Sequence, residues 1–166
     1  MVEDGDAVYL SQVSEADEPA GPVPEGGRLP ALASVGGKAI YSYRPFDEAQ
    51  APIAERDRDV DAERVRAELR ALHDQRLVVD QASPASGGVS AGAFEGHRHV
   101  SGRDDPYRDL HAVAVPVRTP DEYGVAALEV TGHAGGLSGR RLEDDVASLL
   151  VAAGKSVETD LVQGRG

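Results

Sequence analysis

The tightest limit on the fold comes from two apolar segments, residues 111–118 and 125–131, separated by a short polar stretch. In the first segment Val113, Val115 and Val117 alternate with small residues, a period-two pattern that predicts a strand. Residues 119–123 contain a Pro-Asp pair, which is typical of a turn. The sequence therefore predicts a hairpin of two strands, and its apolar faces must be covered by other elements.

Helical patterns flank this hairpin. Residues 61–74 place Val65, Leu69 and Leu72 at i, i+4 and i+7, which predicts an amphipathic helix. Ser34 is a suitable N-cap for a helix that extends towards residue 43. Further elements are predicted as a helix over 47–55, short strands over 7–13 and 77–79, and a last helix over 137–161. The order β, α, α, α, β, loop, β, β, α predicts an α+β domain with a mostly antiparallel sheet flanked by helices.

The last predicted helix has Ser138 as its N-cap. Helical spacing assigns its buried face to Leu142, Val146, Leu149, Ala153, Val157 and Leu161. Residues 81–109 have no period and are rich in Gly, Ser, Asp and His, so they are predicted to form a loop insertion. The whole chain, residues 1–166, is expected to be a single domain.

Composition excludes several classes of function. The chain has no cysteine, which rules out disulfides and thiolate chemistry, and its net charge of −12 argues against a nucleic-acid partner. No segment is apolar enough to span a membrane and no signal peptide is recognised, so we expect a cytoplasmic protein without a membrane partner. Many acids, only two lysines and small hydrophobes indicate a halophilic acidic protein. A mesophilic protein with an arginine bias is the alternative.

Motifs for catalysis are weak. Gly36-Gly37-Lys38 suggests a phosphate-binding loop, but Leu32 and Ala39 stand where that motif needs Gly and Ser or Thr. A helix N-terminus at residues 34–37 could still hold a small anion or polar ligand, with close helix packing as the alternative. His97 and His99 are weak metal candidates, and a solvated polar loop is the favoured interpretation because a histidine pair needs a third ordered ligand. We therefore expect neither a catalytic residue nor a cofactor.

Several segments in order resemble a known family. They are residues 5–10 (GDAVYL), 27–40 (GRLPALASVGGKAI), 68–70 with 77–80, 111–117 (HAVAVPV) and 125–132. Together they resemble the effector-binding C-terminal domain of IclR-type transcription regulators, with Leu32 in place of the family's usual His. The resemblance implies a GAF/profilin-like fold, a small-molecule effector pocket between sheet and helix, an oligomer, and control of an attached winged helix-turn-helix.

The same resemblance implies a set of effector-binding residues: Val35, Gly36, Asp80, Ala112, Glu129 and Thr131. Ala112 stands where the family often has Cys, and Glu129 and Thr131 stand where it has small hydroxyl residues. Two carboxylates, from Asp80 and Glu129, would repel a carboxylate effector. The effector is then neutral or cationic, or a buried carboxyl is protonated, or the pocket is degenerate. Glu129 could also point outward as an edge-strand charge.

No winged helix-turn-helix is recognised, so the chain is interpreted as an N-terminally truncated effector domain that does not bind DNA itself. We expect a sensing and oligomerisation domain that forms homo-oligomers, or hetero-oligomers with full-length relatives. The first alternative is a ligand-free dimerisation module or remnant that modulates such relatives. A second alternative, from another class, is a metal-dependent enzyme centred on His97, His99 and His111.

Overall fold

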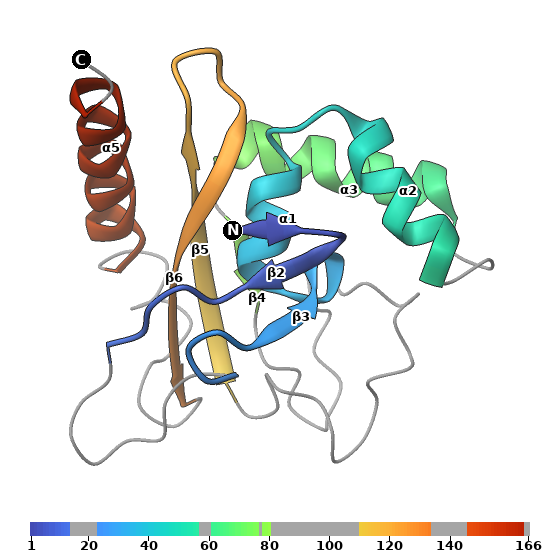
Figure 1. Cartoon of the computed structure of the whole chain (residues 1–166), viewed down its shortest axis with the longest axis horizontal. Helices are drawn as coiled ribbons and strands as arrows, with labels where there is room; N and C mark the ends of the chain where they lie inside the picture. Colours follow the sequence, from blue (N-terminus) through green and yellow to red (C-terminus); the bar gives the residue numbers. More distant parts are fainter. Residues whose placement is uncertain (14–22, 57–60, 77, 81–109, 134–145, 165–166) are drawn as a thin grey trace.

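The structure, a computed structural model, describes residues 1–13, 23–56, 61–76, 78–80, 110–133 and 146–164 (Figure 1). It is a mixture of helices and antiparallel strands, as the α+β prediction requires. The predicted insertion at 81–109, with His97 and His99, lies outside the described residues, as do Ser138 and Leu142. Among the helices that are described, none is long and apolar enough to cross a membrane.

The predicted hairpin forms the centre of the molecule. Strands β5 (Leu110–Arg118) and β6 (Gly124–His133) pair antiparallel, and β4 (Val78–Asp80) pairs with the other edge of β5, which gives the order β4-β5-β6. Ala112 lies opposite Asp80 on one side and opposite Thr131 on the other. Residues directly opposite in a sheet share a face, so these three positions form one row across the sheet.

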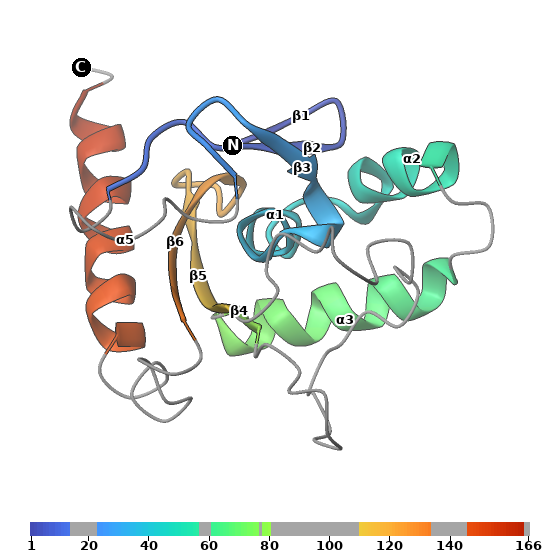
Figure 2. The same ribbon diagram turned by 90° about the horizontal axis from the view of Figure 1, so that it is seen from below.

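A helix covers each face of this sheet (Figure 2). Helix α1 (Val35–Tyr41) packs on the face that carries Ala112 and Ala114, where the small side chains let the helix approach closely. Helix α5 (Ala147–Gln163) packs on the other face, where Leu150 meets Val113 and Val115. The alternation of β5 therefore serves two cores at once, which explains why all its central residues are buried.

A second sheet holds the N-terminal residues in the order β1-β2-β3, from β1 (Val2–Glu3), β2 (Asp6–Val8) and β3 (Arg28–Pro30). The strand predicted over 7–13 is wrong in its bounds, because β2 ends at Val8 and Val13 is fully exposed. A short 3-10 turn, η1 (Ala31–Ala33), leads from β3 into α1.

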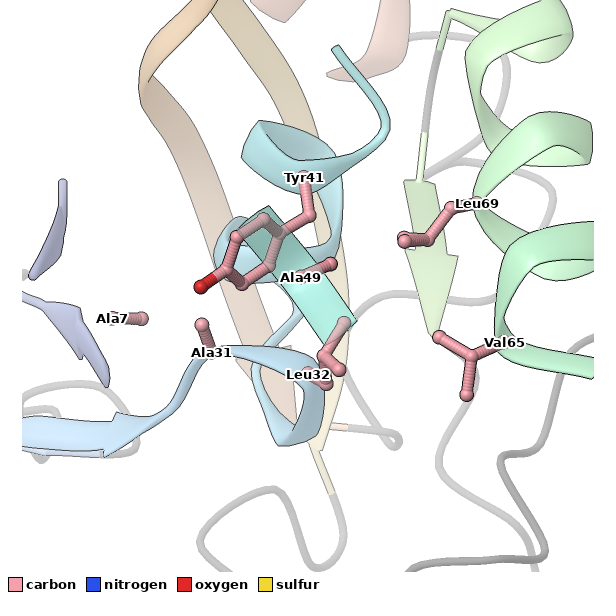
Figure 3. Packing of buried hydrophobic residues seen from close by; sticks show 7 residues of the cluster. All are labelled: Ala7, Ala31, Leu32, Tyr41, Ala49, Val65 and Leu69. Atoms are coloured by element: carbon pink, nitrogen blue, oxygen red, sulfur yellow. The ribbon is translucent and has the colours of Figure 1, made fainter. Parts of the chain in front are cut away.

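Helices α2 (Phe46–Arg56) and α3 (Ala62–Gln75) complete the fold and confirm the predicted helices in this region. The Asp61 carboxylate caps α3 by accepting from the backbone N–H groups of Glu63 and Arg64. In Figure 3, Val65 and Leu69 point from α3 into the core beside α1 and α2. That cluster consists of Ala7, Ala31, Leu32, Tyr41, Ala49, Val65 and Leu69. The predicted stripe of this helix is thus its buried face.

The buried face predicted for the last helix is wrong along α5 itself, although Val146, just before α5, packs against the Leu150 cluster as predicted. Leu149 is 72% exposed, and Ala153, Val157 and Leu161 are also exposed, whereas Ala147, Leu150 and Gly154 face the sheet. A Cβ on Gly154 would lie 3.2 Å from Val115 Cγ2, so glycine at this position permits a close approach to β5. The side of α5 that carries Gly154 is buried because it lets the helix backbone come close to β5.

Candidate functional site

The N-terminus of α1 is closed by a buried serine. The Ser34 hydroxyl accepts from the Gly37 N–H at 2.9 Å and donates to the Ala31 carbonyl at 3.1 Å, which confirms the predicted N-cap. A Cβ on Gly37 would lie only 2.1 Å from the Ala31 carbonyl oxygen. Close packing therefore requires the glycine at position 37.

The neighbouring glycine meets an acid from the sheet. The Gly36 N–H donates to Glu129 Oε2 at 2.9 Å, across 93 residues of sequence, and the Tyr9 hydroxyl donates to the same oxygen at 3.4 Å. The positive end of a helix favours a carboxylate at this position. The expected anion-binding position of the helix is thus filled by the protein's own carboxylate, and the alternative of an outward-facing Glu129 is wrong.

A cavity of about 580 Å³ lies beside this contact. Its walls are the N-terminal segment 7–13, the first turns of α1 and strand β6, and its volume is in the usual range for small-molecule sites. Aliphatic side chains, including Ile40 and Ala127, supply much of its lining. The polar residues of the lining are Tyr9, Ser11, Gln12, Glu129 and Thr131. This arrangement can enclose an apolar body and hydrogen-bond one polar end of it.

The structure brings together three of the six predicted effector-binding residues, since Gly36, Glu129 and Thr131 all line this cavity. Val35 and Ala112 do not line it. They are 1% and 0% exposed and pack together in the core between α1 and the sheet. Asp80 is placed by its backbone alone, opposite Ala112 in β4.

Most lining residues were missed by the sequence analysis, Tyr9 and Ile40 among them. Tyr9 and Ile40 belong to the segments that carry the family resemblance, but nothing local marks either as part of a site. Tyr9 reaches Glu129 across 120 residues of sequence, a separation at which periodicity and motif spacing give no signal.

The metal-dependent alternative gains no support from the described residues, where no group of three or more metal-binding side chains is found. Of its proposed centre, His97 and His99 lie outside them, and His111 is placed by its backbone alone, in β5.

The fold matches solved structures of transcription regulators. An IclR regulator of Alicyclobacillus acidocaldarius is 15% identical, with a TM-score of 0.68 over 96% of this chain and 57% of its own length. An IclR-family regulator of Brucella abortus is 23% identical, with a TM-score of 0.65 over 96% of this chain and 54% of its own. The inducer-binding domain of the Acinetobacter PobR transcription factor, a double mutant in complex with 3-hydroxybenzoic acid, is 18% identical, with a TM-score of 0.66 over 95% and 83%.

These identities are low, so the likeness establishes the fold alone. No family model matches the sequence, and no curated protein matches it. The chain spans little more than half the length of the Alicyclobacillus and Brucella regulator chains. It has the fold of the effector-binding domains of IclR-family regulators, and the proteins compared are regulators of transcription rather than enzymes.

Proposed function

We propose that this chain is the small-molecule-sensing domain of an IclR-type transcription regulator, with the GAF/profilin-like fold expected of that family. The observation that carries the proposal is the 580 Å³ cavity at the N-terminus of α1, in a fold shared with an inducer-binding domain. Effector would bind between segment 7–13 and β6, in contact with Gly36, Glu129 and Thr131. Val35, Ala112 and Asp80 would shape the site from the core and from β4.

The cavity favours a neutral or cationic effector. A ligand carboxylate would have to displace Glu129 from the Gly36 N–H, which holds it at 2.9 Å. A ligand that donates hydrogen bonds can instead use the acceptor capacity of the carboxylate and of the Thr131 hydroxyl. An amine, amidine or amide on a flat apolar body satisfies both the polar end and the aliphatic walls.

Signalling would act through assembly, since we propose that the domain forms homo-oligomers or hetero-oligomers with full-length relatives and does not itself bind DNA. An effector shifts such an equilibrium only if it binds the two arrangements with different affinity. We expect the protein to be cytoplasmic. We also expect it to be halophilic, because its net charge is −12 and it has only two lysines. The alternative is a dimerisation module without a ligand. The open cavity favours the sensing domain.

A charge-matched ligand series tests the proposal. Benzamidine, benzamide and benzoate share a ring and differ in charge, and their binding can be followed by NMR at the backbone amides of Gly36 and Thr131. We expect benzamidine or benzamide to shift both amides, and benzoate to shift neither in the wild-type protein. In Glu129→Gln the preference for benzamidine over benzoate should fall at least tenfold. Asp160→Asn, an exposed carboxylate on α5, is the matched control.

Two results would count against the proposal. Benzoate binding at Gly36 and Thr131 with Glu129 intact would overturn the assigned ligand charge. Shifts at these two amides for none of the three compounds, in either the wild type or the variant, would favour the ligand-free module. The measurement should be made at about 0.1 M and again at about 2 M KCl, since salt screens exposed charges.

A further inference from the structure

A second hollow of about 580 Å³ lies on the other side of α1, between the start of α2 and helix α3. Its floor contains Tyr41 and Leu69, which are 3% and 5% exposed, together with the half-buried ring of Phe46. We call this hollow the α2–α3 groove. It shares no lining residue with the cavity at Glu129, so it is a separate site.

The rim of the groove is basic although the chain is strongly acidic. Arg66, Arg70 and His73 follow at i, i+4 and i+7, so they lie on one face of α3, and Arg44 joins them from the segment before α2. Asp47 is the one carboxylate residue of the lining, against three arginines. On a chain of net charge −12, this local excess of guanidinium groups selects for an anion.

Two of these guanidinium groups are already held in place. Arg44 donates to the Gly124 carbonyl at 2.7 Å and lies 3.7 Å from Glu48 Oε2. The Arg66 guanidinium lies 4.5 Å from the centre of the Phe46 ring, and its Nε is 4.0 Å from Glu63 Oε1. By contrast, Arg70 is exposed, and within the described residues no hydrogen bond or ion pair engages it. In the part of the chain that the structure describes, Arg70 therefore has no hydrogen bond or ion pair that a ligand would have to replace.

We propose that the α2–α3 groove binds a small aromatic carboxylate. The carboxylate would pair with Arg70, whose planar fork matches it in a bidentate manner. The ring of the ligand would lie on the Leu69 and Phe46 surface, where apolar contact and the Arg66 guanidinium both favour a flat aromatic body. An inorganic anion can pair with Arg70 but cannot make the apolar contact with Leu69 and Phe46. A neutral aromatic amide can make the apolar contact but cannot form the ion pair.

The test compares benzoate, inorganic phosphate and benzamide by titration, with the backbone amides of α3 followed by NMR in the intact chain. We expect benzoate to bind at least tenfold more tightly than phosphate or benzamide. Arg70→Gln should weaken benzoate binding about tenfold, because it removes a charge-assisted contact. Arg70→Lys should restore part of the loss. Arg64→Gln, on the same helix but outside the groove lining, makes the same change in net charge and should leave the affinity unchanged.

Glu129→Gln separates this site from the proposed sensing cavity, because it should leave benzoate binding at α3 unchanged. Equal binding of phosphate and benzoate would show that the apolar floor plays no part and would overturn the proposal. Equal effects of Arg70→Gln and Arg64→Gln would overturn it as well, since net charge alone would then account for the loss. If no ligand binds in the cavity at Glu129, the outcomes expected for the α2–α3 groove stay the same.

Discussion

The carboxylate of Glu158 joins helix α5 to the sheet through hydrogen bonds, and removing this carboxylate should measurably destabilise the fold. Glu158 accepts from Arg118 at the backbone N–H (2.9 Å), at Nε (2.7 Å) and at Nη2 (3.2 Å). Both side chains are largely buried, with 17% and 20% exposure. The last residue of α5 that is buried against the sheet is Gly154. The turns of α5 after Gly154 are therefore held against the sheet by Glu158.

The size of the effect follows from this geometry. Hydrogen bonds to a charged group contribute about 1.5–3 kcal/mol, and partial exposure favours the lower half of that range. We expect Glu158→Ala to lower the free energy of unfolding by about 2 kcal/mol. For a chain of this length that corresponds to a fall in Tm of about 4–8 °C. Glu158→Gln keeps an acceptor oxygen but loses the charge, so about half the effect should remain.

Urea denaturation followed by circular dichroism measures this change, with Asp160→Ala as the control on the exposed side of the same helix. The control should stay within about 0.5 kcal/mol of the wild-type protein. Amide hydrogen exchange should rise most in residues 155–163 of Glu158→Ala. A loss no larger than that of Asp160→Ala would refute the reasoning, because the three hydrogen bonds would then contribute nothing net.

Two further predictions concern α5 and the β5–β6 turn. Leu150→Ala should lower the free energy of unfolding by about 2–3 kcal/mol in urea denaturation, because Leu150 is only 7% exposed. Leu149→Ala should change it by less than about 0.5 kcal/mol. If Leu149→Ala were the more destabilising variant, the buried face predicted from the sequence would be the correct one. The Tyr123 hydroxyl donates to Glu48 Oε2 at 2.6 Å, and this hydrogen bond, with burial, raises the pKa of Tyr123 above its ordinary value. Since a raised pKa favours the protonated phenol in the folded state, the contribution of this hydrogen bond to stability is present below pH 10 and is lost as the pH rises further. Glu48→Ala should lower the midpoint of the Tyr123 step in an absorbance titration. An unchanged midpoint would show that Glu48 does not raise the pKa of Tyr123.

Local chemistry made several elements predictable. Ser34 and Asp61 cap their helices with side-chain oxygens that the sequence displays, and the apolar spacing of residues 65, 69 and 72 leaves α3 one side to bury. The hairpin was equally clear, because alternation and turn chemistry agree along residues 111–131. Each of these signals lies within a few residues of the structure that it specifies.

The buried face of α5 could not be found in the same way. The run Leu149-Leu150-Val151-Ala152-Ala153 is apolar on every side, so helical spacing admits more than one stripe. The deciding residue is Gly154, because a Cβ at this position would lie only 3.2 Å from a methyl group of Val115 and would crowd the approach of α5 to β5. Helical spacing continued from Leu142 and Val146 predicted Leu149 on the buried face, whereas the structure buries Leu150, a side chain of the same size.

The candidate site shows the same division between local and distant causes. The resemblance placed Gly36 and Glu129 in one pocket, but their hydrogen bond depends on two residues 93 positions apart. A Cβ at position 36 would lie 2.9 Å from Glu129 Oε2, so the glycine leaves room for the flexible acid side chain to reach the helix N–H. An acid at position 129, where the resemblance implies a small hydroxyl residue, therefore changes more than the net charge of the cavity. It gives the N–H of the helix an internal partner, and the carboxylate becomes the group that an incoming ligand must satisfy.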